Sequence, residues 1–121
     1  KKHWSQMKAA LDMSSAVMNG DLLYGFSHFG RGRFFCLDPK TGKILWQGPE
    51  RTGENVMFLS IPGHILALIN SGELQVITAR GDRYEKVASW RVAEDSTWAP
   101  PVLLQAGILV KDLEALTLWA F

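Results

Sequence analysis

The chain of 121 residues is long enough for one domain of ordinary size and too short for two. Its hydrophobic fraction of 47% and charged fraction of 21% exclude a disordered chain, a collagen and a coiled coil. The 13 basic and 12 acidic side chains leave a net charge of +1, which is too small to attract nucleic acid or an anionic membrane. We therefore expect no nucleic-acid partner.

Two markers repeat along the sequence, and successive copies of each are 42 to 44 residues apart. The first marker is a tryptophan, at Trp4, Trp46 and Trp90. The second is a glycine between two apolar runs, at Gly20, Gly63 and Gly107. A period of this length is typical of propellers and solenoids. We expect one repeat-built segment over residues 1–121, with repeats of roughly 5–48, 49–92 and an incomplete 93–121.

Short apolar runs bounded by turn residues predict strands, because helices of globular domains usually need about 10 residues or more. In chain order, the first repeat has strands at residues 15–17, 22–27, 33–37 and 44–47. The second repeat has strands at residues 57–61, 65–69, 74–78 and 84–91. The third repeat has strands at residues 101–104, 108–111 and 115–121, which is one strand short. An amphipathic helix over residues 8–17 is the alternative for the N-terminal part.

Four strands per repeat predict an all-β fold built from blades of a β-propeller, a ring of roughly 4 to 8 four-stranded sheets. Its inner strands should be apolar on both faces, as residues 65–69 are. The 121 residues correspond to about 2.8 repeats, fewer than a closed ring needs. We therefore expect a partial propeller, which either continues in further blades or is completed by other copies of the chain.

The segment from Asp38 to Gly42 carries the clearest turn signal. The Asp38 side chain can accept hydrogen bonds from backbone amides ahead of it, and Pro39 presets its own φ. Gly42 can adopt the left-handed conformation that closes such a turn. A hairpin is therefore predicted here.

The stretch Cys36-Leu-Asp-Pro-Lys-Thr-Gly-Lys-Ile-Leu-Trp46 resembles the pyrroloquinoline quinone (PQQ) repeat, whose signature reads Ala-x-Asp-x-x-Thr-Gly-x-x-x-Trp. The match covers Asp38, Thr41, Gly42 and Trp46, with Cys36 in place of the alanine. This repeat forms the blades of quinoprotein dehydrogenases and of propellers that resemble an outer-membrane assembly lipoprotein. The resemblance implies a periplasmic or cell-envelope location.

In the PQQ-repeat family the tryptophan stacks against the turn of the adjacent blade and joins the two blades. The resemblance therefore implies a blade-docking role for Trp46, together with the turn residues Asp38, Thr41 and Gly42. It extends this role to Trp4 and Trp90 through the period. The second copy keeps Trp90 but lacks the Asp-x-x-Thr-Gly turn.

No catalytic, cofactor-binding or metal-binding residue is assigned in this segment. The single cysteine, Cys36, excludes an internal disulfide and a Cys-paired zinc site. His3, His28 and His64 lack the spacing of metal ligands and are interpreted as solvated loop residues. No transmembrane segment is expected, because polar and turn residues interrupt the longest apolar stretch, residues 56–69.

Arg31 lies in a basic and aromatic stretch whose other members are Phe26, His28, Phe29, Arg33, Phe34 and Phe35. We interpret the aromatics as packing between blades rather than stacking on nucleic acid, and keep Arg31 as a candidate surface contact. The tripeptide Arg80-Gly81-Asp82 is interpreted as a hairpin turn rather than an adhesion motif.

Two functions are compatible with the sequence. The first is a non-catalytic propeller scaffold for protein–protein interaction in the bacterial cell envelope, with a protein partner or the remaining blades as its contacts. The second is a fragment of a PQQ-dependent alcohol or sugar dehydrogenase, whose PQQ and calcium ligands would lie on other blades. The scaffold is favoured, because no catalytic set of residues can be assembled from this sequence.

Overall fold

A computed structural model describes residues 1–120, which form three antiparallel β-sheets and no α-helix. Sheet A contains β1 (Val17–Asn19), β2 (Leu22–Ser27), β3 (Arg33–Leu37) and β4 (Ile44–Gln47). Sheet B contains β5 (Val56–Ile61), β6 (His64–Ile69), β7 (Glu73–Thr78) and β8 (Lys86–Arg91). Sheet C contains β9 (Val102–Leu104), β10 (Gly107–Lys111) and β11 (Leu116–Ala120). A short 3₁₀ turn, η1 (Phe29–Arg31), joins β2 to β3.

The predicted all-β class and the predicted number of strands in each repeat are confirmed for the described residues. The strands β2, β3 and β4 have the predicted bounds, and most others differ by one residue at an end. The predicted end of the last strand, Phe121, lies outside the described residues.

Two predicted strand starts are wrong. The first strand begins at Val17 rather than at residue 15, because the hairpin at Gly20 pairs Asn19 with Leu22 and so fixes its register. Strand β8 begins at Lys86 rather than at residue 84, because the Tyr84 side chain packs against Phe34 and Trp46 of sheet A. The second difference arises from contacts between distant segments, which a local pattern does not contain.

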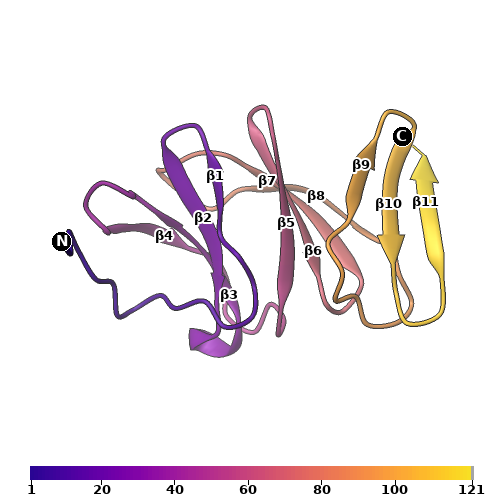
Figure 1. Cartoon of the computed structure of the whole chain (residues 1–121), viewed down its shortest axis with the longest axis horizontal. Helices are drawn as coiled ribbons and strands as arrows, with labels where there is room; N and C mark the ends of the chain where they lie inside the picture. The colour runs from indigo at the N-terminus through magenta and orange to yellow at the C-terminus, as the bar shows by residue number, and fades with distance from the viewer. Residues whose placement is uncertain (121) are drawn as a thin grey trace.

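The three sheets lie side by side along the chain, with sheet B between the other two (Figure 1). An apolar core fills the junction between sheets A and B, and Tyr24, Phe34 and Trp46 from sheet A meet Ile65 and Ile77 from sheet B there. A second core fills the junction between sheets B and C and joins strands β6 and β7 to strand β10. Each junction is therefore a face-to-face packing of two sheets.

Strand β6 shows why the central sheet is apolar on both faces. Ile65, Ala67 and Ile69 belong to the core shared with sheet A, whereas Leu66 and Leu68 belong to the core shared with sheet C. Side chains of a strand alternate between the two faces of its sheet, so a strand covered on both sides must be apolar at every position. The predicted two-faced burial of this strand is confirmed.

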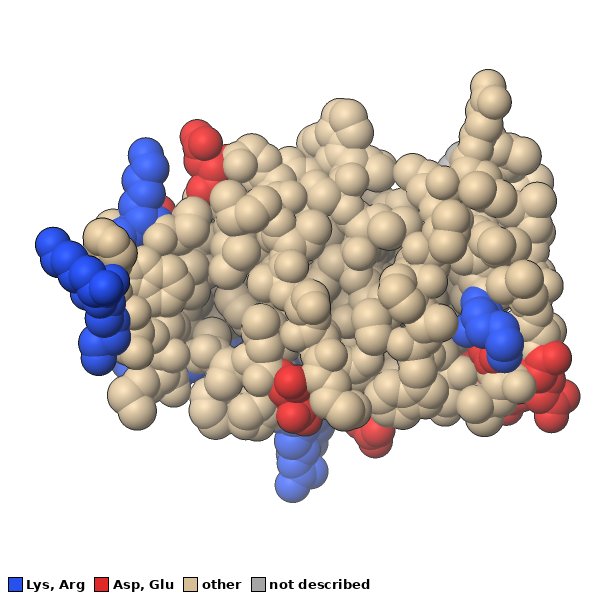
Figure 2. Space-filling model, in the orientation of Figure 1, with Lys and Arg blue, Asp and Glu red and all other residues tan. Residues whose placement is uncertain are grey.

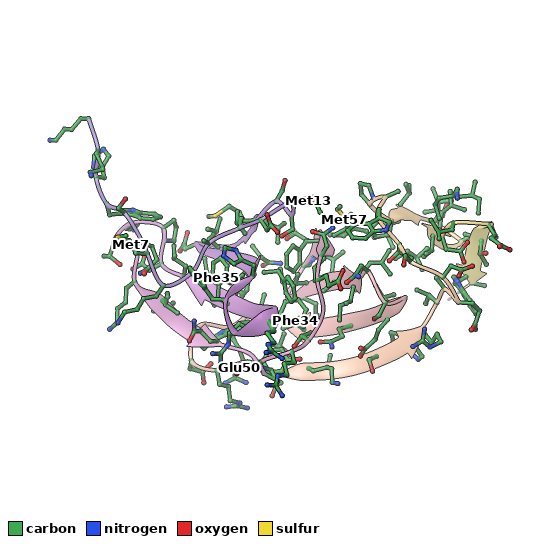
Figure 3. The ribbon with its side chains drawn as sticks, turned by 90° about the horizontal axis from the view of Figure 1, so that it is seen from below. Met7, Met13, Phe34, Phe35, Glu50 and Met57 are labelled. Atoms are coloured by element: carbon green, nitrogen blue, oxygen red, sulfur yellow. The ribbon has the colours of Figure 1, made fainter. Side chains whose placement is uncertain are left out.

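The N-terminal segment, residues 1–16, lies against the outer face of sheet A. Ala9 joins Phe35 and Leu37 in a third apolar cluster, and Leu11 pairs with Ser27 at the end of β2. Figure 3 shows Phe35 on the side of this segment and Phe34 on the side of sheet B, as expected for neighbours in a strand. The alternative of a helix over residues 8–17 is wrong, because this part of the chain runs as irregular backbone along the sheet.

The surface formed by β1, β5 and β9 carries few charged side chains. Figure 2 shows this surface, with the charged groups gathered near its margins. None of the described residues forms a helix that is long and apolar enough to cross a bilayer.

Candidate interaction sites of the sheets

The turn between β3 and β4 is built by the residues that carry the repeat signature. The Asp38 carboxylate accepts a hydrogen bond from the amide of Lys40 at 2.9 Å, and the Asp38 carbonyl accepts one from the amide of Gly42 at 2.8 Å. The Thr41 hydroxyl accepts a hydrogen bond from the amide of Lys43 at 3.2 Å. Gly42 has a φ of +76°, which a residue with a side chain rarely adopts. The turn is therefore fixed by local hydrogen bonds.

Trp4 lies directly on this turn. Its indole nitrogen donates a hydrogen bond to the Pro39 carbonyl at 2.8 Å, and its ring packs over Gly42. A Cβ atom placed on Gly42 would lie 2.6 Å from Cδ2 of the Trp4 ring. Gly42 is therefore required twice, once for its backbone conformation and once because the indole comes so close.

Trp46 makes the corresponding contact one sheet further along the chain. Its indole nitrogen donates a hydrogen bond at 2.7 Å to the carbonyl of Arg80, which lies in the loop between β7 and β8. The side chain is 8% exposed, and its ring packs edge-on against Tyr84 with 5.6 Å between the ring centroids. Trp46 thus joins sheet A to a loop of sheet B.

The loop that receives Trp46 is stabilised by ion pairs. The Arg80 guanidinium donates two hydrogen bonds to the Asp82 carboxylate, at 2.5 and 2.8 Å. Arg80 thereby holds the pKa of Asp82 below its usual value. The Arg83 guanidinium also contacts Glu85 at 3.0 Å. Arg80-Gly81-Asp82 therefore lies in a connection between two strands, with its charged side chains paired to each other.

Trp90 makes no corresponding contact within residues 1–120. It is 56% exposed, and its indole nitrogen has no acceptor among these residues. It borders a cleft of about 450 Å³ between the outer strands of sheets B and C. The cleft is mainly apolar, and its lining includes Leu74, Trp90, Val92, Ile108 and Trp119. Across the cleft, the Trp119 indole nitrogen donates a hydrogen bond to the Val92 carbonyl at 2.8 Å.

Within residues 1–120, no element covers the outer face of sheet C. Ile108 and Val110 of β10 point into the core with sheet B, so Leu109 and its cross-strand partners Val102 and Leu118 point away. The exposed apolar side chains on this face, called here the outer face of sheet C, are Val102, Leu104, Leu116 and Leu118. Large exposed apolar patches mark interaction sites of proteins.

Asn19 provides a second link between sheets A and B that the sequence did not indicate. Its side-chain nitrogen donates a hydrogen bond to the Ile61 carbonyl at 2.7 Å and lies 3.1 Å from the His64 carbonyl. Asparagine next to glycine signals only a turn, and backbone carbonyl acceptors leave no mark in a sequence. His64, predicted to be a loop residue, instead opens strand β6 and is half-buried.

Tyr24 and Cys36 face each other on β2 and β3 inside the core between sheets A and B. Burial raises the pKa of the Cys36 thiol to about 11. Burial, together with the neighbouring Cys36, also raises the pKa of the Tyr24 hydroxyl. A buried thiol with a raised pKa is a poor nucleophile, so this pair is suited to packing rather than to catalysis. Residues 1–120 bring together no group of three or more His, Cys, Asp and Glu side chains that could hold a metal ion.

Arg31 lies apart from the tryptophan contacts, at the end of η1. Its side chain is exposed, and its backbone has a φ of +58°. The aromatic residues near it in sequence do not form a stacking surface, because Phe26, Phe34 and Phe35 are buried in the cores. Phe29 packs against His28, with 4.5 Å between the ring centroids.

The structure therefore brings the predicted docking residues together in part. Trp4 meets the turn of Asp38, Thr41 and Gly42, whereas Trp46 and Trp90 lie at separate junctions. No protein-family model and no curated protein matches the sequence.

Proposed function

We propose that this chain is a segment of a PQQ-like β-propeller and acts as a non-catalytic scaffold for protein–protein contact in the bacterial cell envelope. One observation carries the proposal: the indoles of Trp4 and Trp46 each donate to a turn carbonyl of the adjoining sheet. Trp46 therefore joins sheet A to sheet B, and Trp4 joins the N-terminal segment to the turn of sheet A. The envelope location is taken from the resemblance of the repeat alone.

The outer face of sheet C is the proposed contact surface. Sheet B covers one face of sheet A, and sheet C covers the other face of sheet B. Apolar side chains fill both junctions. The outer face of sheet C carries Val102, Leu104, Leu116 and Leu118, each 42% to 64% exposed. Another sheet of the same kind, supplied by a second copy of the chain or by further blades, fits such a face.

Light scattering after gel filtration, combined with binding of an apolar dye, tests this proposal. The full chain should self-associate as its concentration rises, and should enhance the fluorescence of the dye. The double variant Leu104→Glu/Leu118→Glu should reduce both signals, because it places charge on the outer face of sheet C.

A matched control places the same charges at exposed apolar residues of the N-terminal segment, in the variant Met7→Glu/Met13→Glu. This control should leave both signals unchanged. A chain that stays monomeric and binds no dye would contradict the proposed contact surface. Dye-linked alcohol oxidation after incubation with PQQ and calcium would overturn the non-catalytic role in favour of the dehydrogenase alternative.

A further inference from the structure

Asn19 and Gly20 lie at the tip of the hairpin between β1 and β2, beside the turn between β5 and β6 of sheet B (Figure 1). Asn19 ends β1 and pairs with Leu22, and Gly20 turns the chain with a φ of +60°. Gly20 is exposed, and no described atom outside its chain neighbours lies within 4 Å of the place that a Cβ would occupy. The turn is therefore free of steric cover.

An asparagine followed by a glycine can lose its side-chain amide in a reaction with its own backbone. The Gly20 nitrogen attacks Cγ of Asn19, a C–N bond forms, and the side-chain nitrogen leaves as ammonia with the proton of the Gly20 amide. Water then opens the resulting succinimide ring, adding hydroxyl to a ring carbonyl carbon and hydrogen to the nitrogen, and leaves aspartate or isoaspartate. Glycine favours the attack, because it has no side chain to hinder the approach.

The other two asparagines of the chain lack this combination. Asn55 is buried and precedes the branched side chain of Val56. Asn70 precedes Ser71, and its side-chain oxygen accepts hydrogen bonds from two backbone amides. Asn19 is therefore the asparagine whose backbone hinders the reaction least.

The folded chain holds the Asn19 side chain away from this reaction. Its nitrogen donates a hydrogen bond to the Ile61 carbonyl at 2.7 Å, and it lies 3.1 Å from the His64 carbonyl and 3.0 Å from the Ser60 hydroxyl oxygen. These acceptors belong to β5 and β6, so the side chain reaches across to sheet B. Attack by Gly20 requires the side chain to turn back over its own backbone, which breaks these hydrogen bonds.

The product cannot restore the same link between the sheets. An ionised aspartate has acceptor oxygens and no donor, so at residue 19 it would face the carbonyls of Ile61 and His64 without a hydrogen between them. Acceptors left without a donor in this way cost free energy. Isoaspartate also lengthens the backbone of β1 and so disturbs the pairing with Leu22.

We infer that Asn19 is a deamidation site that the junction between sheets A and B protects, and that its modification weakens this junction irreversibly. The reaction proceeds while this edge of the junction is open, so its rate follows the fraction of molecules that are locally open. Water is the co-reactant. The site does not depend on the proposed scaffold function.

Peptide mapping by mass spectrometry, after incubation of the full chain at mildly alkaline pH, measures the reaction at each asparagine. The mass of the fragment that contains residue 19 changes as the amide becomes a carboxyl group, and isoaspartate elutes separately at the same mass. Asn19 should convert about tenfold faster or more in the chain unfolded in urea than in the folded chain. In the unfolded chain it should also convert faster than Asn55 and Asn70, which are internal controls.

Two variants weaken the protection without changing the reacting groups. Trp46→Ala removes an indole from the same junction and should raise the rate at Asn19 in the folded chain about threefold or more. Ser60→Ala removes one acceptor at an exposed position and should raise the rate about twofold. The matched control is Ser89→Ala, an exposed serine on β8 at the other edge of sheet B, which should leave the rate unchanged.

The variant Asn19→Asp reproduces the aspartate product and tests its effect on the junction. Its urea midpoint should lie below that of Asn19→Ala, because the carboxylate adds repulsion to the loss of the hydrogen bonds. Met18→Asp places the same charge on the neighbouring exposed residue and should lower the midpoint less.

Equal rates at Asn19 in the folded and the unfolded chain would overturn the inference. An unchanged rate in folded Trp46→Ala or Ser60→Ala would also overturn it, because the junction would then not control access. Faster conversion of Asn55 or Asn70 in the unfolded chain would place the site elsewhere. A urea midpoint of Asn19→Asp equal to that of the natural chain would show that the modification does not weaken the junction.

Discussion

The junction between sheets A and B and the junction between sheets B and C start from equivalent rows of side chains and end differently. At the first, Trp46 is 8% exposed, bonded to the Arg80 carbonyl and covered by Tyr84. At the second, Trp90 is 56% exposed and borders a cleft. The inner strands are well packed at both junctions, so the difference is confined to the outer strands.

We call the junction between sheets A and B the closed junction and the junction between sheets B and C the open junction. A tryptophan on the fourth strand does not close a junction by itself. Closure needs the segment ahead of the fourth strand in the following sheet, which supplies a carbonyl for the indole and a ring to cover it. Asn19 adds a further link at the other edge of the closed junction, through the carbonyls of Ile61 and His64. The closed junction is therefore a source of stability.

Removing the indole of Trp46 should have the largest effect on the difference between the junctions. Trp46→Ala leaves a cavity beside Tyr84 and removes the hydrogen bond to Arg80, so the free energy of unfolding should fall by about 3–5 kcal/mol. Urea denaturation followed by circular dichroism measures this change. Trp46→Phe should lose less, because it keeps a ring in the core and removes chiefly the hydrogen bond. A loss below about 1 kcal/mol for Trp46→Ala would contradict the closed junction.

Alkaline pH should weaken the closed junction next. The Cys36 thiol has a pKa of about 11 in the folded chain against an ordinary value of 9.0. Between pH 9 and pH 11 the Cys36 thiol is deprotonated in the unfolded chain and still protonated in the folded chain. Its contribution to the free energy of unfolding is therefore fully present below pH 9 and is lost as the pH rises toward 11. The loss should reach up to roughly 2 kcal/mol.

The urea midpoint at pH 8 and pH 10 measures this effect, and Cys36→Ala is its control, because the variant lacks the titrating thiol. The variant should show a smaller change with pH than the natural chain. The open junction has no titrating group at the corresponding place, because Leu68 and Leu74 stand where Tyr24 and Cys36 stand in the closed junction. An equal change in both proteins would show that Cys36 is not the group responsible.

Removing the Asn19 amide should have a smaller effect. Asn19→Ala breaks the hydrogen bonds to the backbone at the end of β5 and the start of β6, so the free energy of unfolding should fall by about 1–2 kcal/mol. Chemical denaturation measures it, with Met18→Ala as the neighbouring control on an exposed side chain. If both variants lose the same amount, the Asn19 link contributes nothing specific.

Trp90→Ala should have the smallest effect on stability. The side chain is mostly exposed and makes no hydrogen bond within residues 1–120, so the free energy of unfolding should change by no more than about 0.5 kcal/mol. The same denaturation measurement gives the value beside that of Trp46→Ala. A loss as large as that of Trp46→Ala would mean that the second junction is closed in solution.

Local chemistry makes the strands and the first turn predictable. Apolar runs between glycines indicate the strands, and Asp38, Thr41 and Gly42 take part in the hydrogen bonds that define their turn. Trp46 can be assigned to docking through the resemblance of this motif. Its acceptor cannot be found in the same way, because the loop at Arg80 lacks the signature and contributes a backbone carbonyl, which any residue can supply.

The rest of the candidate site depends on contacts between distant segments. Apart from Trp4, the sequence pattern gives the N-terminal segment no role, yet this segment covers the outer face of sheet A through Ala9. Trp119 lies outside the tryptophan period, so nothing in the pattern places it opposite Trp90. The cleft results from the stacking of two sheets, and its existence follows only once their registers are known.

Hydrogen exchange of the indole N–H groups, followed by nuclear magnetic resonance, tests the difference between the closed and open junctions most directly. Each tryptophan gives its own indole signal, which variants such as Trp46→Phe and Trp90→Phe assign. We predict slow exchange at Trp46, which is buried and bonded to the Arg80 carbonyl, and fast exchange at Trp90. Equal exchange rates at the two indoles would contradict this difference.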